Sequence, residues 1–470
     1  MSEAPQTLAV KRAQVEFHNF ASLGEPDRVL PHYLDENQRR GLIIETHRDF
    51  IGTMTPFLEI GANAGHTSYM LANQFGGEGF ALDISADALR HGVALQQLWN
   101  LERAPFRVAG DAVALPFRDN SVRFVMACQM LSQFMDIEAV FLEVKRVLMP
   151  GGVFLFTEEP LRRKLSLRLY RAPYQNRMRP WERTLFDWGL LGYLVRDVIG
   201  AEQEESFGIR QNHRMYMDDW HRLITKHFAA HRYQCFIPER GWGERLAKRA
   251  ALSEHRAALW LGGTLTGMCR KSGDAPKASK PPDFTTLLRC PECHGELVRD
   301  ASGTLRSMCG YSAANEGGVY NLLPARLRAE LYPGDRDDAV DFTLPGHVAR
   351  LGEGWYELEE AGVGNKYRWI GERARAVLRP VTSGPQRMRV RGFAHEAQFA
   401  AGQPAIELSA NGVVVAKRNI ERVGLFVIEA DLPDAPEYRV EIASSPTWSV
   451  PEDDRVMSVN ISMLRLVGPE

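Results

Sequence analysis

The sequence predicts an α/β domain with a doubly wound sheet, followed by a small cysteine-bearing segment and an all-β sandwich. Short apolar runs alternate with helical patterns from residue 57 to 160, and such strand–helix repeats build a parallel sheet with helices on both faces. A polar, Pro-rich stretch at 272–283 is typical of a linker. From about residue 345 short runs alternate in period two, which is typical of a β-sandwich.

The α/β region contains five apolar runs that predict strands and three patterns that predict helices. The predicted strands span 56–60, 79–84, 106–112, 121–131 and 153–159, and the predicted helices span 67–75, 85–97 and 137–148. Residues 161–255 are mostly helical by pattern and rich in aromatics. Residues 257–271 return to strand character, so we expect this last run to close the sheet.

The predicted domains follow from these boundaries. The α/β domain covers 1–271, with its core at 50–160 and an insertion at 161–255. The cysteine segment covers 284–325 and the sandwich 345–470. Within the sandwich, Asn411-Gly412 lies between two alternating runs and predicts a hairpin.

Composition excludes several classes of protein. The 470 residues favour two or three domains, and 44% hydrophobic residues exclude a disordered chain. A net charge of -2 gives no general attraction to nucleic acid. The first thirty residues lack the apolar core of a signal peptide, and no apolar run approaches the roughly 20 residues that span a bilayer. We therefore expect a soluble cytoplasmic protein without a membrane span, and a nucleic-acid partner is not expected.

The stretch "EIGANAG" places small residues directly after the first predicted strand. Bare backbone and a free helix N-terminus at the end of a strand allow close approach of a ligand. Asp83 and Asp111 end the next two predicted strands, so three polar features meet at one edge of the sheet. A carboxylate at Asp83 could accept both hydroxyl hydrogens of a ribose, and one at Asp111 could accept an adenine amine. "GANAGHTS" does not match the Gly-x-Gly-x-x-Gly fingerprint of nicotinamide dehydrogenases.

These stretches, together with "VAGDAVALPFRDNSVRFVMACQML" and "EVKRVLMPGGVFLFTEEP", resemble class I S-adenosylmethionine-dependent methyltransferases of the small-molecule type. The resemblance implies a Rossmann-like sheet of seven strands whose last strand is antiparallel, and S-adenosylmethionine as cofactor. It departs from the family at Asn63, where Gly is frequent; Asn tolerates a left-handed backbone. The cofactor-binding residues implied by position are Glu59, Gly61, Asn63, Gly65, Asp83, Ile84, Asp111, Ala112, Cys128 and Gln129.

The acceptor is less defined. We expect a small molecule or saccharide methylated at oxygen, for which a general base helps. The candidate bases lie after the fifth strand: Glu158, Glu159, His213 and His221. Residues 161–183 hold eight Lys or Arg and one acid, so they are either a solvated helical face or a surface for an anionic acceptor. In the family, such a segment usually builds the acceptor site.

Cys290 and Cys293 form one Cys-x-x-Cys knuckle, and Cys309 follows sixteen residues later. Two knuckles would hold a zinc ion, but Arg306 stands where a fourth cysteine would pair with Cys309. The segment resembles the Trm112-like zinc ribbons that accompany methyltransferases. These three cysteines are candidate zinc ligands, and both a zinc-bound and a metal-free ribbon remain open.

The C-terminal region is loosely similar to β-sandwiches of bacterial proteins that build or modify surface polysaccharides, through "GWY" at 354–356 and "YRWIGERA" at 367–374. This similarity favours a glycan precursor as acceptor. Two alternatives stay open: a non-catalytic scaffold built on a methyltransferase fold, and an RNA methyltransferase. The near-neutral charge weakens the RNA alternative.

Overall fold

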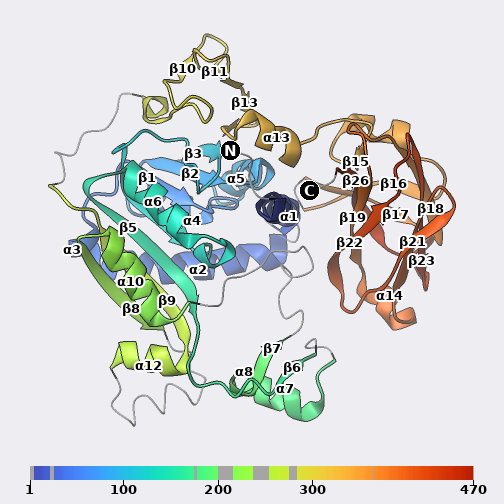
Figure 1. Ribbon diagram of the computed structural model, residues 1–470, viewed down its shortest axis with the longest axis horizontal. Helices are drawn as coiled ribbons and strands as arrows, with labels where there is room; N and C mark the ends of the chain where they lie inside the picture. Colours follow the sequence, from blue (N-terminus) through green and yellow to red (C-terminus); the bar gives the residue numbers. More distant parts are fainter. Residues whose placement is uncertain are drawn as a thin grey trace.

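The computed structural model of the chain arranges an α/β domain, a small cysteine-bearing segment and a C-terminal β region side by side (Figure 1). The described residues are 5–21, 26–173, 177–198, 215–236, 253–274, 283–362, 364–451 and 453–468. None of the helices in these ranges is long and apolar enough to cross a bilayer.

The central sheet has nine strands in the order β13-β14-β3-β2-β1-β4-β5-β9-β8. Their bounds are β1 Phe57–Ile60, β2 Gly79–Asp83, β3 Phe106–Ala109, β4 Val122–Cys128, β5 Leu148–Leu161, β8 Ala230–Phe236, β9 Gly263–Arg270, β13 Asn315–Glu316 and β14 Val319–Asn321. Strands β1 to β5 pair in parallel, whereas β9 runs antiparallel to both β5 and β8. This mixed sheet confirms the predicted Rossmann-like fold and its antiparallel closing strand.

Two of the helices on the sheet begin where a side chain satisfies a free backbone N–H group. Ser85 accepts a hydrogen bond from the Ala88 N–H at 3.0 Å, and Asp136 accepts one from the Ala139 N–H at 3.1 Å. The helices of this domain are α2 Pro26–Thr46, α3 Arg48–Ile51, α4 His66–Asn73, α5 Ala86–Leu98, the short 3-10 helix η1 Leu131–Gln133, and α6 Ile137–Val147. Their apolar faces pack on the buried strands of the sheet.

The insertion at 161–255 contains more strand than its sequence predicts. Its described elements are β6 Tyr170–Ala172, α7 Pro180–Asp187, α8 Leu191–Leu194, β7 Val195–Val198, α10 Met217–His227, β8, and α12 Glu254–Leu261. β8 is the last strand at one edge of the central sheet, and each of its residues pairs with β9. The unit of β6, β7, α7 and α8 extends away from the sheet (Figure 1).

The cysteine segment pairs with the central sheet and packs against the α/β domain. β14 pairs in parallel with β3, so the predicted terminal strand of this segment extends the central sheet. Buried Leu288, Cys290 and Leu305 belong to the same hydrophobic cluster as the strands of the α/β domain. The remaining elements are a 3-10 turn at Phe284–Leu287, β10 Val298–Arg299, β11 Leu305–Arg306, β12 Ser312–Ala313 and α13 Ala325–Leu331.

Residues 339–467, called the C-terminal β-domain below, contain two large antiparallel sheets that contribute to one hydrophobic cluster, and a two-stranded sheet of β24 Trp448–Val450 and β25 Asp453–Met457. One sheet contains β15 Ala339–Asp341, β16 Trp355–Ala361, β17 Asn365–Ile370, β19 Gln386–Ala394, β22 Gly424–Leu432 and β26 Asn460–Val467. The other contains β18 Arg373–Leu378, β20 Ala405–Ala410, β21 Val413–Asn419 and β23 Tyr438–Ser445. Asn411 and Gly412, both at positive φ, connect β20 to β21 as the sequence predicts.

The N-terminal helix α1, Pro5–Ala21, lies between the α/β domain and the C-terminal β-domain (Figure 1). Its Ala13 and Phe17 pack against Leu425 of β22. Its Val15 packs against Leu323 and against α13. A single helix therefore contacts all three parts of the molecule.

Candidate functional site

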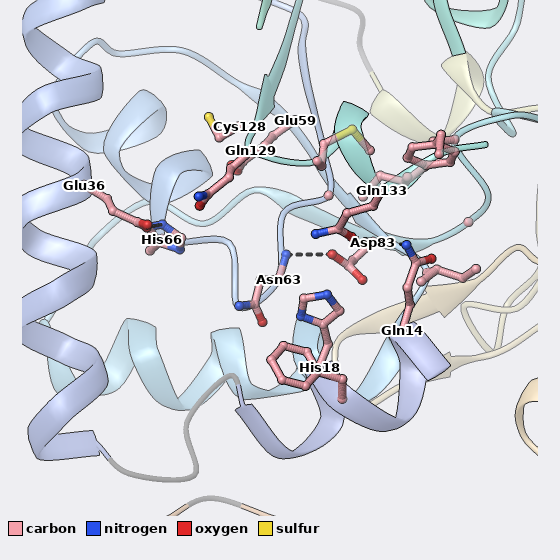
Figure 2. A pocket seen from close by; sticks show the side chains of 18 of the residues that line it. Gln14, His18, Glu36, Glu59, Asn63, His66, Asp83, Cys128, Gln129 and Gln133 are labelled. Carbon is pink, nitrogen blue, oxygen red and sulfur yellow. Dashed lines mark hydrogen bonds and ion pairs between the residues drawn. The ribbon is translucent and has the colours of Figure 1, made fainter. Parts of the chain in front are cut away.

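A cavity of about 360 Å³, called the central cavity below, lies at the carboxyl ends of β1, β2 and β4 (Figure 2). Nine of the ten residues predicted to bind a cofactor line it: Glu59, Gly61, Asn63, Asp83, Ile84, Asp111, Ala112, Cys128 and Gln129. The tenth, Gly65, is the N-cap of α4 at φ 79°. A parallel sheet brings these residues together because its strands end at one edge.

The loop after β1 needs residues that tolerate a left-handed backbone. Gly61 has φ 70° and Asn63 has φ 52°. A Cβ at Gly61 would lie 3.0 Å from the Met130 side chain, so a larger residue would push into the loop after β4. The Asn63 amide donates to the Tyr33 hydroxyl at 3.1 Å, which fixes the loop against α2. Asn63 is therefore compatible with the loop conformation.

Asp83 is buried at the end of β2 and faces the cavity (Figure 2). Its Oδ2 accepts from the Asn63 N–H and its Oδ1 from the Ser85 N–H, each at 2.8 Å. A carboxylate offers about four lone-pair sites, so each oxygen can accept one more hydrogen bond. Asp83 thus ties the first loop to the second strand and still presents acceptors to a ligand.

Asp111 forms an ion pair with Lys11, a residue that the sequence does not predict to lie at the site. Lys11 of α1 donates from Nζ to Asp111 Oδ2 at 2.5 Å, and the Val113 N–H donates to Oδ1 at 3.1 Å. Lys11 and Asp111 are each only 4% exposed, so this ion pair is shielded from solvent at the cavity rim. The N-terminal helix therefore closes the end of the cavity where the adenine contact is predicted.

Two buried carboxylates, Glu59 and Glu159, stabilise the loops that follow β1 and β4. Ser68 donates to Glu59 at 2.5 Å, and burial raises the pKa of Glu59 to about 7. Glu159 accepts from three successive backbone N–H groups, at residues 130 to 132, and burial likewise raises its pKa to about 7. Burial raises the pKa of the Cys128 thiol well above its usual value. These groups hold the ends of β1 and β4 in place.

Helix α2 supplies a polar wall that sequence reasoning misses. Glu36 Oε2 lies 2.7 Å from His66 Nε2, and Arg40 Nη1 lies 2.8 Å from the same nitrogen. The Tyr33 ring stacks on the His66 ring at 4.0 Å. Burial opposes ionisation of Glu36, but His66 and Arg40 lower its pKa to about 2. Burial lowers the pKa of His66. The available signal is the spacing of Tyr33, Glu36 and Arg40, which places them on one helical face.

The three described candidate bases, Glu158, Glu159 and His221, do not line the central cavity. Glu158 accepts from Arg40 at 2.7 Å and also contacts Arg39. Glu159 is fully buried beneath the loop after β4, and His221 lies on α10, where its Nδ1 is 2.9 Å from the Tyr233 hydroxyl. His213 lies outside the described residues.

The basic segment 161–183 also contributes no described residue to the lining. Arg162 and Arg163 stack over Tyr216 and Tyr193, and Arg177 contacts Glu421 of the C-terminal β-domain at 3.2 Å. The lining instead comes from α1 and α2, through Lys11, Gln14, Tyr33, Glu36 and Arg40 among others.

Cys290, Cys293 and Cys309 converge, with all three sulfur atoms within 4.8 Å of one another. Cys290 Sγ and Cys309 Sγ are 3.6 Å apart, close to the roughly 3.8 Å between thiolates around a tetrahedral zinc ion. Ser307 Oγ lies 3.2 Å from Cys293 Sγ, and this hydrogen bond lowers the pKa of Cys293 to about 7. The donor set therefore fits zinc with a hydroxyl or water as fourth ligand.

Comparison with known proteins gives a partial match. Residues 58–156 match the family model described as a methyltransferase domain. Over 131 residues the chain is 30% identical to phosphoethanolamine N-methyltransferase 2 of Caenorhabditis elegans, covering 27% of this chain and 28% of that enzyme. The chain thus spans less than a third of the length of this relative.

Solved structures with a similar arrangement include a SAM-dependent methyltransferase from Methanosarcina mazei, at 19% identity and TM-score 0.32, covering 48% of this chain and 97% of that chain. A protein from Pyrococcus horikoshii matches at 19% identity and TM-score 0.31, covering 50% and 92%. The family match covers β1 to β4 and most of β5, whose ends and loops line the central cavity.

Proposed function

We propose that this chain, whose residues 58–156 form a methyltransferase domain, transfers a methyl group from S-adenosylmethionine to a small-molecule acceptor. The supporting observation is the convergence of a left-handed loop, Asp83 and Asp111 on one cavity. The acceptor atom we favour is a hydroxyl oxygen, and the acceptor class we favour is a saccharide or glycan precursor.

The lining fits a bound S-adenosylmethionine. Asp83 keeps free lone pairs for two ribose hydroxyls, and the cavity volume lies within the roughly 300–1,000 Å³ of ligand sites. Among the described residues, Asn63 Oδ1 and His66 Nδ1 are buried without a hydrogen-bond partner. Such atoms are costly unless a ligand or water satisfies them. When bound, the cofactor supplies a methyl group already activated by its sulfonium.

Different residues of this chain would bind different parts of the cofactor. Asp83 would hold the ribose, and Asp111 with Ala112 would contact the adenine edge. The loop from Gly61 to Gly65 would surround the methionine part. Cys128, the last residue of β4, and Gln129, which follows it, would lie beside the sulfonium. Binding both reactants in line supplies much of the rate in such displacements.

His66 is the side chain that we favour as proton acceptor for a hydroxyl. Its lowered pKa keeps it neutral near pH 7, and its Nδ1 has no partner among the described residues. In this role Nε2 carries the proton and donates it to Glu36 Oε2 at 2.7 Å, beside Arg40 Nη1 at 2.8 Å, and Nδ1 is the basic nitrogen. Glu158, Glu159 and His221 lack this access to the cavity.

A saccharide acceptor is supported by the C-terminal β-domain, whose sequence is loosely similar to β-sandwiches of proteins that build or modify polysaccharides. An amine acceptor is the second candidate, because the relative from Caenorhabditis elegans is named a phosphoethanolamine N-methyltransferase. A scaffold without catalysis would bind no cofactor.

Calorimetry with S-adenosylmethionine tests the proposal first. We expect binding by the native chain and at least tenfold weaker binding by Asp83→Ala. Asp431→Ala is the control, because Asp431 is an exposed acid on β22 outside the cavity lining. If the native chain does not bind S-adenosylmethionine, the proposal is contradicted and the non-catalytic scaffold is the remaining alternative. Methyl transfer from labelled cofactor to sugar hydroxyls, or to phosphoethanolamine, then decides between the two acceptor classes.

A further inference from the structure

A second cavity, of about 940 Å³, lies where α1, α5, α13 and the C-terminal β-domain meet. We call it the junction cavity. In Figure 1, α1 and α13 occupy the space between the central sheet and the C-terminal strands. Its volume falls within the roughly 300–1,000 Å³ of small-molecule sites. No residue of this cavity belongs to the methyl-transfer site described above.

The acidic side chains that line the junction cavity are already engaged by other groups. Three of the four carboxylates contact an arginine, whereas Asp341 accepts hydrogen bonds from Thr343. Glu16 accepts from Arg389 at 2.6 Å, Asp87 and Glu316 contact Arg90, and Asp341 accepts from the Thr343 N–H at 2.9 Å.

Two buried guanidinium groups in the same wall hydrogen-bond to neutral acceptors. Arg391, 7% exposed, donates to Ser462 Oγ and to the Glu16 carbonyl, both at 2.9 Å. Arg465, 3% exposed, donates to the Glu330 carbonyl at 2.5 Å, and its Nε has no partner among the described residues. Within the described residues, the only ion pair of Arg465 is with the Glu330 carboxylate, at 3.9 Å. A buried cation without a close counter-charge is costly.

Two more cations face the same space. Arg328 of α13 donates to the Ser312 carbonyl at 3.2 Å, again a neutral acceptor. The Lys366 ammonium on β17 has no hydrogen-bond or ion-pair contact within the described ranges. Four cationic side chains, three from the C-terminal β-domain and one from α13, therefore line this cavity, and within the described ranges they have no acidic partner at contact distance apart from the long Arg465–Glu330 pair.

We infer that the junction cavity is a second ligand site, which takes a small molecule carrying a phosphate or carboxylate group. Arginine forks bind either anion through paired hydrogen bonds, and burial strengthens such bonds. Burial lowers the pKa of both Arg391 and Arg465, although carboxylates such as Glu16 act in the opposite direction on each. An anion in the cavity would supply a counter-charge at contact distance and the partner that Arg465 Nε lacks.

The ligand of this site is not the methyl acceptor. Helix α1 separates the two cavities: Lys11 and Gln14 line the central cavity, whereas Val15 and Glu16 line the junction cavity. Methyl transfer requires both reactants in one cavity. The junction cavity is therefore a separate binding site whose occupant contacts α1 from the opposite side.

Calorimetry on the full chain at low ionic strength tests the inference with two probes, inorganic phosphate and D-glucuronate. We expect saturable binding of at least one probe, and the responding probe identifies the anionic group. Lys366→Ala and Arg391→Gln should weaken binding at least fivefold. Arg375→Gln is the matched control, because Arg375 lies on β18, is paired with Glu441 and is outside the cavity.

Lys366→Ala keeps the test decisive if Arg391→Gln disturbs the fold, because the Lys366 ammonium makes no ion pair within the described part of the chain. Asp83→Ala should leave phosphate or glucuronate binding unchanged, which separates this site from the proposed methyltransferase activity. Absence of saturable binding of both probes to the native chain would overturn the inference. Equal affinities of the native chain and Lys366→Ala would overturn it as well.

Discussion

Lys11 Nζ lies 2.5 Å from Asp111 Oδ2, across one hundred residues of sequence, and both side chains are buried. The same helix is fixed on its other side, where Glu16 accepts from Arg389 of β19 at 2.6 Å. The rim of the central cavity thus depends on a contact with the C-terminal β-domain. A substitution on either side of α1 should therefore change the affinity for the cofactor.

Lys11→Met should destabilise the fold and weaken cofactor binding. It leaves Asp111 buried without its cation, and breaking a buried ion pair in this way costs about 3–5 kcal/mol. We expect a comparable loss in the free energy of unfolding, measured by urea denaturation, and roughly tenfold weaker S-adenosylmethionine binding. Lys417→Met is the control, because its pair with Glu407 is exposed and such pairs contribute about 0–1 kcal/mol.

Arg389→Met should weaken cofactor binding without touching the central cavity. Arg389 is buried against Glu16 and Glu429, so its loss loosens α1 where the helix meets the C-terminal β-domain. We expect a lower melting temperature and several-fold weaker S-adenosylmethionine binding. Arg387→Met, two residues away on the same strand but partly exposed, should change neither. Unchanged cofactor affinity in Arg389→Met would mean that the C-terminal contact does not position α1.

The sheet could be predicted from the sequence because each of its central strands has a recognisable local pattern of apolar residues. β1, β2 and β4 are buried along their whole length, so each appears as a mostly apolar run that contains one charged residue, namely Glu59, Asp83 and Arg123. Strand ends in a parallel sheet share one edge, which is why the sequence alone is enough to place Asp83 and Asp111 together. β8 escaped prediction because "AHRYQCF" is a mixed run that becomes a strand through pairing with β9.

The cover of the cavity could not be predicted in the same way. Lys11, Tyr33 and Glu36 are polar side chains on helices whose composition is that of an ordinary surface helix. Their role arises from contacts with residues 30 to 100 positions away, such as Asp111 and His66, and no local pattern encodes those contacts. Likewise, the cysteine spacing indicates a metal site but does not show that β14 joins the central sheet.

Glu59→Gln should make stability less dependent on pH. In the native state burial raises the pKa of Glu59 to about 7, whereas the unfolded value is 4.5. Unfolding therefore releases a proton between these values, and the free energy of unfolding falls as pH rises through them. The difference of 2.5 pH units corresponds to about 3 kcal/mol. Gln keeps an acceptor for Ser68 but does not titrate.

Urea denaturation at pH 5 and pH 7.5 measures this effect. The native chain should lose more stability than Glu59→Gln between the two conditions. Glu102→Gln, at an exposed position, should follow the native chain. Parallel losses in the native chain and Glu59→Gln would show that Glu59 is ionised throughout this range.

The purified protein should contain one zinc ion per chain, bound by Cys290, Cys293 and Cys309. Their sulfur atoms already lie within 4.8 Å of one another. Elemental analysis by mass spectrometry should find zinc in the native chain and almost none in Cys309→Ser. Cys235→Ser should retain the metal, because Cys235 lies on β8. A native chain purified without zinc, and unable to take it up after reduction, would contradict this prediction.

His66→Asn should slow methyl transfer to a hydroxyl acceptor by about 100-fold, the usual contribution of a general base. Burial lowers the pKa of His66 below 6.5, so the native kcat should rise with pH through a value under 6.5 and then level off. The variant should lose this rise, and added imidazole should restore part of the rate. Cofactor affinity should change little, because Asp83 and the loop after β1 remain. His221→Asn, on the exposed face of α10, should behave like the native enzyme. A variant with native pH dependence would assign the proton to another acceptor.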